Sequence, residues 1–432
     1  MDAAGEIRTG RTRWFRLAWA ALGIALLAIA WLQGYVVRQE TLLGILLIVA
    51  AIAAAGISVA TPLAARSRAA VPGLAALVAL AQLTWFAASW YPAWVLSQAS
   101  AIVLGFLAFG VVWTLRPRGV TAGRVVLRAG GGLAVAVAVI VSAALITTSI
   151  SPRPVVTLVQ NSGGYGNSFQ PAAEPGRTVV QDNTLLINDL KTMGDPNAGA
   201  AAFALSNGPM IQAGYNLVAL DYALAPEYTY PTPVIQLSQA ISFLQDHAEE
   251  YGLDMSRVVI GGGSAGGHIA AQFAVVQTNP AFATEIGIKP VLAASALKAV
   301  ALDSAALDAS RAGRTEAADA FNDWQFTLAA RAYLEMSGFP QAGDAGVDQA
   351  DIITHVSAQF PPAFIADGNY GTFPDQAQDL SDRLTALSVT NELLLPPLSE
   401  AKLGHGYMGL SESKYVDDYN AKKIAFLATV VG

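Results

Sequence analysis

The chain of 432 residues contains no cysteine, few charged residues and only four histidines. Without cysteine, disulfides, thiol nucleophiles and thiolate metal sites are excluded. Charged residues make up 13% of the sequence and hydrophobic residues 53%, which is too apolar for an ordinary soluble chain. Four histidines leave few candidates for a general base.

The charges are divided unequally along the chain. Residues 1–150 hold 11 of the 25 basic residues, all arginine, and only 3 of the 32 acidic residues. Residues 151–432 hold 14 basic and 29 acidic residues. This division predicts a membrane domain at 1–150 and an acidic soluble domain at 151–432. It argues against nucleic-acid binding, which needs a basic surface.

Five apolar stretches, each near the roughly 20 residues that a spanning helix needs, fill the first domain. No small-residue cleavage site stands out, so the first stretch is expected to be an uncleaved anchor. The expected transmembrane helices are Leu17–Val37, Thr41–Pro62, Val71–Trp90, Trp94–Leu115 and Ala129–Ile150.

The arginines predict the orientation in the membrane. They gather before the first stretch, between the second and third, and between the fourth and fifth, whereas the other connections carry little charge. By the positive-inside rule the N-terminus is cytoplasmic. After five crossings, residues beyond Ile150 are expected outside the cell (plasma) membrane.

Residues 151–432 alternate between strand-like and helical patterns, which predicts an α/β fold with a mostly parallel sheet covered on both faces. Residues at about 305–350 show no strand pattern and are expected to form a helical cap. The strand-like runs are Val155–Val159, Tyr215–Leu220, Val258–Ile260, Ala299–Leu302, Ala363–Ala366 and Glu392–Leu395, and the helical patterns include Val234–Glu250 and Gln376–Leu387.

One glycine-rich turn joins a strand-like run to a helical one. Gly262-Gly263-Ser264-Ala265-Gly266 satisfies G-x-S-x-G, the nucleophile elbow that presents a serine on a strained turn. Glycines are needed because a Cβ beside the serine would collide with the adjoining strand or helix. Ser264 is therefore the candidate nucleophile.

A second glycine turn, Asn161–Gly166, follows the first strand-like run. Because parallel sheets bind ligands at the carboxyl ends of their strands, this turn is expected at the site. The backbone N–H groups of Gly163 and Gly164, with that of Ala265, are the candidate oxyanion donors.

The next run leads into a family resemblance. Asp221–Glu227, followed by Tyr230-Pro231, resembles the D-Y-R-L-A-P-E…F-P signature of hormone-sensitive-lipase-like esterases, which are α/β hydrolases close to the carboxylesterase group. Gly263–Gly267 is similar to their G-D-S-A-G-G, with Gly263 for the Asp, and Asn161–Gly164 falls where they have H-G-G-G. The resemblance covers residues 155–430 and implies a carboxylic ester hydrolase with no metal or organic cofactor.

The resemblance also implies the catalytic base. His405, in Gly404–Tyr407, follows the last strand-like run and matches the family's H-G-[FY]. A serine followed late in the chain by a histidine is the triad order of this fold. His247 is expected to be solvated, and His268 and His355 to be structural.

The catalytic acid is open. The family pattern G-x-x-D-x-L-x-D falls on residues 368–375, where Gly371 occupies the position of the catalytic Asp. Asp375 matches the second Asp of the pattern and is our first candidate. Asp367, at the end of one strand, and Asp303, after the preceding strand, are the alternatives.

Two function classes follow from these residues. The first is a membrane-anchored serine esterase or lipase that cleaves an acyl-lipid or other apolar ester. The second is a degenerate, non-catalytic envelope binding protein, because Gly371, Asn161 and Gly263 each replace a residue that the family normally keeps. The family's first two strands, ahead of the oxyanion loop, are also expected to be missing.

Overall fold

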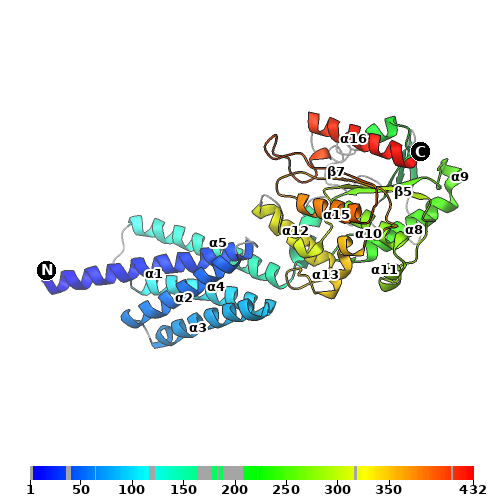
Figure 1. The fold of residues 1–432 in the computed structure, drawn as a ribbon. Helices are drawn as coiled ribbons and strands as arrows, with labels where there is room; N and C mark the ends of the chain where they lie inside the picture. Colours follow the sequence, from blue (N-terminus) through cyan, green and yellow to red (C-terminus); the bar gives the residue numbers. More distant parts are fainter. Residues whose placement is uncertain are drawn as a thin grey trace. The chain divides into compact units, whose positions relative to one another are not determined.

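The protein divides into two compact units, Met1–Pro154 and Val155–Gly432, in the computed structural model. The structure describes residues 3–35, 40–63, 65–115, 122–162, 178–181, 184–187, 208–220, 222–315, 319–409 and 412–432. Figure 1 shows the helical N-terminal unit and the mixed C-terminal unit.

The N-terminal unit consists of helices joined by short connections in its described residues. Four helical stretches are long and apolar enough to cross a membrane, and a shorter one, Ala134–Ile150, follows. The four long stretches fit a membrane region and correspond to the first four predicted spans, whereas Ala134–Ile150 lies within the fifth. The helices are α1 (Ala3–Tyr35), α2 (Glu40–Ala60), α3 (Ala65–Ala88), α4 (Tyr91–Thr114) and α5 (Ala122–Ile150).

Buried polar contacts supplement the apolar packing of this bundle. Trp19 of α1 donates its indole N–H to the Thr61 hydroxyl at 3.0 Å. Gln33 of α1 and Ser97 of α4 both donate to the side-chain oxygen of Gln82 on α3, at 3.2 and 3.0 Å. Hydrogen bonds of this kind fix helix partners where lipid supplies no competing water.

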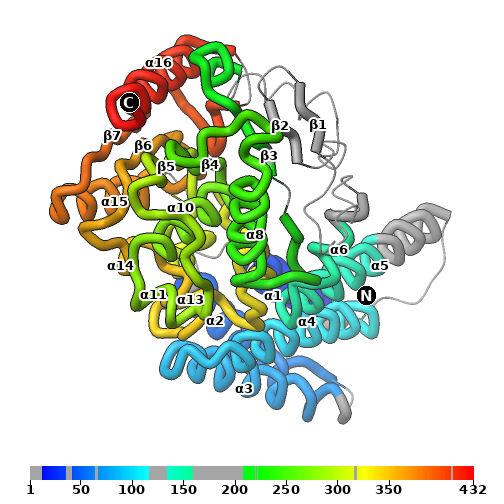
Figure 2. Tube along the Cα trace, turned by 90° about the vertical axis from the view of Figure 1, so that its right-hand side faces the viewer, coloured from blue at the N-terminus to red at the C-terminus, as the bar shows by residue number. Residues whose placement is uncertain are grey.

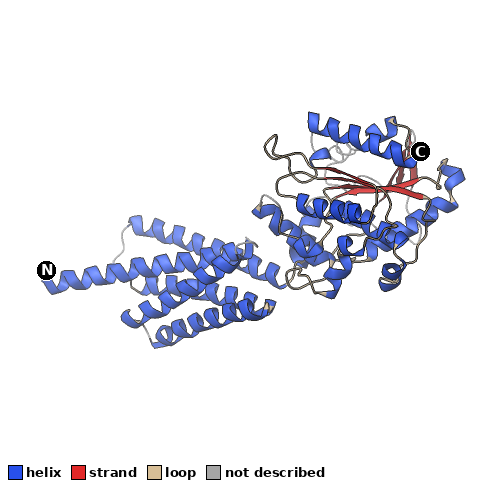
Figure 3. Ribbon diagram, in the orientation of Figure 1, coloured by secondary structure: helices blue, strands red, loops and turns tan. Residues whose placement is uncertain are grey.

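The C-terminal unit contains two hydrogen-bonded groups of strands, drawn in red in Figure 3. In the first, in the order β1-β2-β3, β1 is antiparallel to β2 and β2 is parallel to β3. The second, β4-β5-β6-β7, is parallel throughout. The strands are β1 (Thr178–Gln181), β2 (Thr184–Ile187), β3 (Leu217–Leu220), β4 (Val258–Gly263), β5 (Leu297–Asp303), β6 (Ala363–Ala366) and β7 (Asn391–Leu394).

The expectation for Val155–Val159 was wrong, because this run is helical and belongs to α6 (Arg153–Ser162). Pro154 lies in the first helical turn, where its missing N–H costs nothing, and the Ser151 hydroxyl accepts a hydrogen bond from the Arg153 N–H at 3.3 Å. These N-terminal features outweigh the strand preference of the valines. Strands β1 and β2 precede β3 in a region where the sequence predicted none.

Helices cover both faces of the parallel sheet, because successive apolar side chains along each strand point to opposite faces. On β6, Phe364 and Ala366 pack with Tyr419 of α16 (Lys414–Val431). Ala363 and Ile365 join the core formed with α10 (Ala265–Thr278) and α15 (Pro374–Ala386). Figure 1 shows α16 on one side of the strands and α10 and α15 on the other, and Figure 2 shows the same elements from the side.

The remaining helical elements connect and cover these strands. Those of the first half of the unit are α8 (Thr232–Asp246), α9 (Ala248–Tyr251), α10 (Ala265–Thr278) and α11 (Pro280–Glu285). The expected cap region contains η3 (Ala309–Arg311), α12 (Ala320–Tyr333) and α13 (Ala345–Ala350). The last are α14 (Ile352–His355), α15 (Pro374–Ala386), η4 (Tyr407–Gly409) and α16 (Lys414–Val431).

The strand register brings the carboxyl ends of β4, β5 and β6 level with one another. Gly263 pairs with Asp303, and Asp303 pairs with Ala366. The next residues along the chain, Ser264, Ser304 and Asp367, therefore lie at one edge of the sheet, where parallel sheets place their ligands.

Candidate active site

Ser264 occupies a sharp turn between β4 and α10. Its backbone has φ 54° and ψ −120°, a conformation rare for any residue but glycine. The Ser264 N–H is bonded to the Asp303 carbonyl at 2.8 Å. A Cβ on Gly262 would lie 2.4 Å from the Gly266 carbonyl carbon, so only glycine fits there. This is the geometry of a nucleophile elbow.

His405 reaches Ser264 from the loop that follows β7. Its Nε2 atom lies 2.8 Å from the Ser264 Oγ. The imidazole contacts the rings of Phe326 on α12 and Phe373, with centroid separations of 4.8 and 5.5 Å. Burial lowers the pKa of His405 from 6.5 to about 4, so the ring is neutral at neutral pH and able to accept a proton.

The loop that carries His405 is fixed against the end of β6. Asn369 donates its backbone N–H to the Leu403 carbonyl at 2.8 Å, and its side-chain oxygen accepts the Leu403 N–H at 2.9 Å. A Cβ on Gly368 would lie 2.4 Å from the same carbonyl. This close approach holds the histidine loop in one position.

The other ring nitrogen of His405 contacts a hydroxyl rather than a carboxylate. Thr372 Oγ1 lies 2.9 Å from His405 Nδ1 and 2.7 Å from Asp367 Oδ1. Asp367 also accepts the backbone N–H groups of Gly368 at 2.6 Å and Phe373 at 2.9 Å. A continuous line of hydrogen bonds therefore runs from Ser264 to Asp367.

Asp367 is almost completely buried, with 1% of its surface exposed. This burial raises its pKa from 3.8 to about 6, although hydrogen bonds from Ser304, Thr372 and two backbone amides act in the opposite direction. The Ser304 hydroxyl accepts the Gly406 N–H at 3.0 Å as well. Ser304 thus joins Asp367 to the residue that follows His405.

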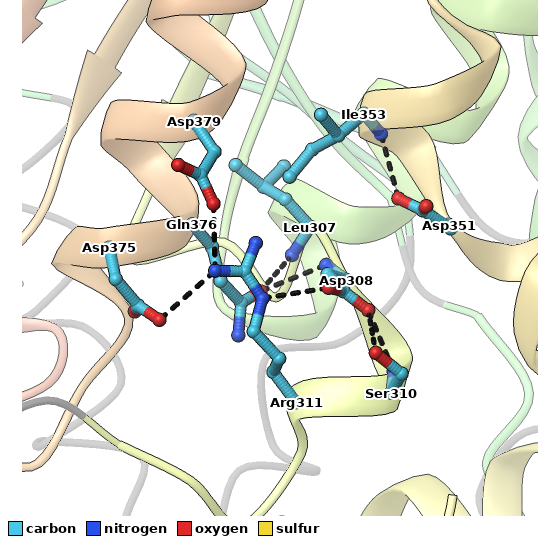
Figure 4. A network of polar contacts seen from close by, with 9 residues as sticks. All are labelled: Leu307, Asp308, Ser310, Arg311, Asp351, Ile353, Asp375, Gln376 and Asp379. Carbon is cyan, nitrogen blue, oxygen red and sulfur yellow. Dashed lines mark hydrogen bonds and ion pairs between the residues drawn. The ribbon is translucent and has the colours of Figure 1, made fainter. Parts of the chain in front are cut away.

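The carboxylate of Asp375 points elsewhere. It accepts a hydrogen bond from Arg311 at 3.1 Å, in a network that Figure 4 shows with Asp308 and Asp379 bound to the same guanidinium. Asp303 is also separately engaged, because it accepts the Tyr419 hydroxyl and lies near the buried amine of Lys423. Among the three candidate acids, the geometry favours Asp367.

Gly371, at the family's acid position, adopts φ 58°. A Cβ there would lie 2.8 Å from the Asn322 amide nitrogen and 2.9 Å from the Asp319 Cβ. The backbone at this position is therefore closely surrounded by residues at the start of α12.

Of the candidate oxyanion donors, Ala265 is described and Gly163 and Gly164 lie outside the described residues. Ala265 is the first residue of α10, directly after Ser264, so its N–H belongs to the helix N-terminus. Helix N-termini stabilise negative charge.

The other histidines contact backbone carbonyls rather than Ser264. His268 Nδ1 lies 2.8 Å from the Ala306 oxygen, and burial lowers the pKa of this ring. His247 and His355 lie 2.8 and 3.0 Å from the carbonyls of Phe243 and Asp348. The residues described contain no group of three or more His, Asp or Glu side chains arranged to hold a metal ion.

Part of the C-terminal unit is similar to known proteins. Residues 195–384 match the family model BD-FAE. The chain is 29% identical over 184 residues to the probable carboxylic ester hydrolase LipM of Mycobacterium tuberculosis, covering 41% of this chain and 39% of LipM. It is 28% identical over 203 residues to esterase LipI of the same organism, covering 45% of this chain and 56% of LipI.

Among solved structures, the chain resembles esterase LipW from Mycobacterium marinum, with a TM-score of 0.43 and 23% identity over 58% of this chain and 71% of that one. The matched part of the chain spans about two fifths of the length of LipM and just over half of the length of LipI. The C-terminal unit has an α/β-hydrolase fold and is similar to carboxylic ester hydrolases, and it follows an N-terminal region with four helices that are long and apolar enough to cross a membrane.

Proposed function

We propose that this protein is a membrane-anchored serine hydrolase of carboxylic esters. The observation that carries the proposal is the 2.8 Å contact between Ser264 Oγ on the strained elbow and Nε2 of a neutral, buried His405. A serine within hydrogen-bond reach of an imidazole base is the arrangement required for nucleophilic catalysis. Relatives named as esterases support the same chemistry.

In the proposed reaction, Ser264 Oγ attacks the acyl carbon while His405 Nε2 takes the serine proton. The Ala265 N–H stabilises the oxyanion, and the N–H groups of Gly163 and Gly164 are proposed as further donors from the sequence resemblance alone. Collapse breaks the ester bond, and His405 gives its proton to the leaving alkoxide, which departs as the alcohol. Water then attacks the acyl-enzyme with His405 as base, which releases the carboxylic acid and restores Ser264.

An acyl-lipid or another apolar ester is the proposed substrate class. The N-terminal helices would hold the hydrolase domain near lipid, and the partly exposed ring of Phe326 provides apolar surface beside His405. Both features favour an apolar acyl group over a charged one.

The proposed location of the hydrolase domain is the outer side of the cell membrane. The arginine distribution supports it, and the absence of cysteine from the chain permits a direct test. A single cysteine at an exposed position such as Glu400 is expected to react with an impermeant maleimide in intact cells. Labelling that requires cell lysis would reverse the orientation.

The catalytic proposal is tested by treating the purified full chain with a fluorophosphonate and with short-chain aryl esters. We expect covalent labelling and hydrolysis by the parent and neither by Ser264→Ala. A folded parent that shows neither would support the second candidate, a non-catalytic binding protein, which is favoured by the glycine at position 371.

A further inference from the structure

We propose that Thr372 and Asp367 together take the place of a carboxylate bonded directly to His405, with the Thr372 hydroxyl setting the tautomer of the imidazole. This inference rests on the proposed function of Ser264 and His405. It assigns Thr372 and Asp367 as positioning residues, because both act through His405 rather than on the substrate.

The number of protons on the Thr372 hydroxyl decides the direction of the hydrogen bonds. This hydroxyl has a single proton and lies between two acceptor-capable atoms, Asp367 Oδ1 at 2.7 Å and His405 Nδ1 at 2.9 Å. When Thr372 donates to Asp367, Nδ1 must carry a proton and donate to Thr372. The lone pair is then on Nε2, facing the Ser264 hydroxyl.

The surroundings of Asp367 favour donation of the Thr372 proton to Asp367. Its carboxylate accepts backbone N–H groups from Gly368 and Phe373 and is also hydrogen-bonded by Ser304. These donors support the charged, accepting form of the carboxylate, which attracts the Thr372 proton. The opposite direction would place a proton on Nε2 and prevent His405 from accepting one from Ser264.

The contacts of Thr372 and Asp367 also explain how His405 is oriented although glycine occupies the family's acid position. His405 is held from two sides, because Asn369 fixes the preceding Leu403 and Ser304 accepts the N–H of Gly406. In this position Nδ1 meets a threonine hydroxyl. The carboxylate lies one hydrogen bond further away, at the end of β6.

Titratable groups near Asp367 include His405, through Thr372, and Tyr407. The pKa of Tyr407 is raised by burial and by the charges of Asp303, Asp367 and Asp418. Asp303 in turn faces Tyr419 and Lys423. Among these residues, Asp367 is the carboxylate that the Thr372 hydroxyl connects to His405.

The test uses Thr372→Val, which keeps the shape of the side chain without its hydroxyl, and Thr372→Ser, which keeps the hydroxyl. In the full chain, we expect Thr372→Val to lower kcat on the order of 10³-fold with KM within about threefold, by analogy with loss of tautomer control in a triad. Thr372→Ser should stay within about tenfold of the parent. Asp367→Asn should resemble Thr372→Val.

Thermal melting verifies that each variant is folded. A folded Thr372→Val that hydrolyses esters as fast as Thr372→Ser would overturn the positioning role while leaving Ser264 and His405 in place. A parent that neither hydrolyses esters nor reacts with a fluorophosphonate would instead overturn the proposed function, and the relay with it. The two failures are therefore distinct.

Discussion

The side-chain amide of Asn322 donates a hydrogen bond to the carbonyl oxygen of Gly371 at 2.8 Å. This contact joins the start of α12 to the loop between Asp367 and α15, at the position where related hydrolases are expected to carry their acid. It leaves little space for a side chain, because a Cβ on Gly371 would lie 2.9 Å from the Cβ of Asp319.

Replacement of Gly371 by Asp is therefore expected to damage the site rather than restore a direct triad. The left-handed backbone and the close contacts with Asn322 and Asp319 predict a loss of about 1–3 kcal/mol in the free energy of unfolding. Turnover should not rise. Thermal melting and ester hydrolysis measure the two effects.

Gly252→Asp is the matched control, because Gly252 has φ 63° and a Cβ added there would meet no other atom within 4 Å. It should cost no more than about 1–2 kcal/mol, the cost of the left-handed backbone alone. A Gly371→Asp variant that is more active than the parent would show that position 371 can supply the acid directly.

The pH dependence of kcat/KM should follow the protonation of Asp367 rather than that of His405. The pKa of His405 is lowered to about 4, so this base is already neutral at pH 5. Asp367, with its pKa raised to about 6, is protonated below that pH and no longer attracts the Thr372 proton. Activity should rise with pH through a midpoint of about 6.

Thr372→Val should abolish the component of the profile centred at about 6, because protonation of Asp367 then has no route to His405. Residual activity of that variant should extend to lower pH. A parent whose activity is constant from pH 5 to pH 7 would contradict the role given to Asp367.

Asp375→Asn is expected to leave turnover within about twofold of the parent. Arg311 keeps its contacts with Asp308 at 2.7 Å and Asp379 at 2.8 Å, and the Asp375 side chain is 31% exposed. The loss in unfolding free energy should therefore stay below about 1 kcal/mol. A hundredfold loss of kcat in a stable variant would return Asp375 to the catalytic site.

Phe326→Ala should lower kcat about tenfold or more, because this ring contacts His405 and helps to exclude water from it. Phe321→Ala on the same helix is the control, since that side chain is 55% exposed and should stay within about twofold. Steady-state kinetics of the two variants separate a local contact from a general effect on α12. Equal losses would mean that Phe326 has no specific role beside the imidazole.

Much of the parallel sheet could be predicted from the sequence because its buried strands are short apolar runs between clear turns. The prediction for β6, Ala363–Ala366, matches the structure, and that for β4 ends three residues early, at the glycines of the elbow. The run at Val155–Val159 misled because its valines favour a strand, whereas the N-terminal signals of Ser151 and Pro154 favour a helix.

The acid could not be identified from the sequence because its connection to His405 is indirect. The family's sequence pattern predicts one carboxylate at a fixed spacing, and it assigns no role to the position of Thr372. Its role depends on the register that aligns the ends of β5 and β6 and on the loop contacts of Asn369. The glycine at position 371 was the sequence signal that the usual arrangement had changed.

Mass spectrometry of the full chain, quenched in acid during turnover of an aryl ester, tests directly whether Ser264 is the nucleophile. We predict that the acyl group is found on the peptide that contains Ser264 and that it is absent from Ser264→Ala. An acyl adduct on another residue, or hydrolysis that persists in Ser264→Ala, would contradict the assignment of Ser264 as the nucleophile.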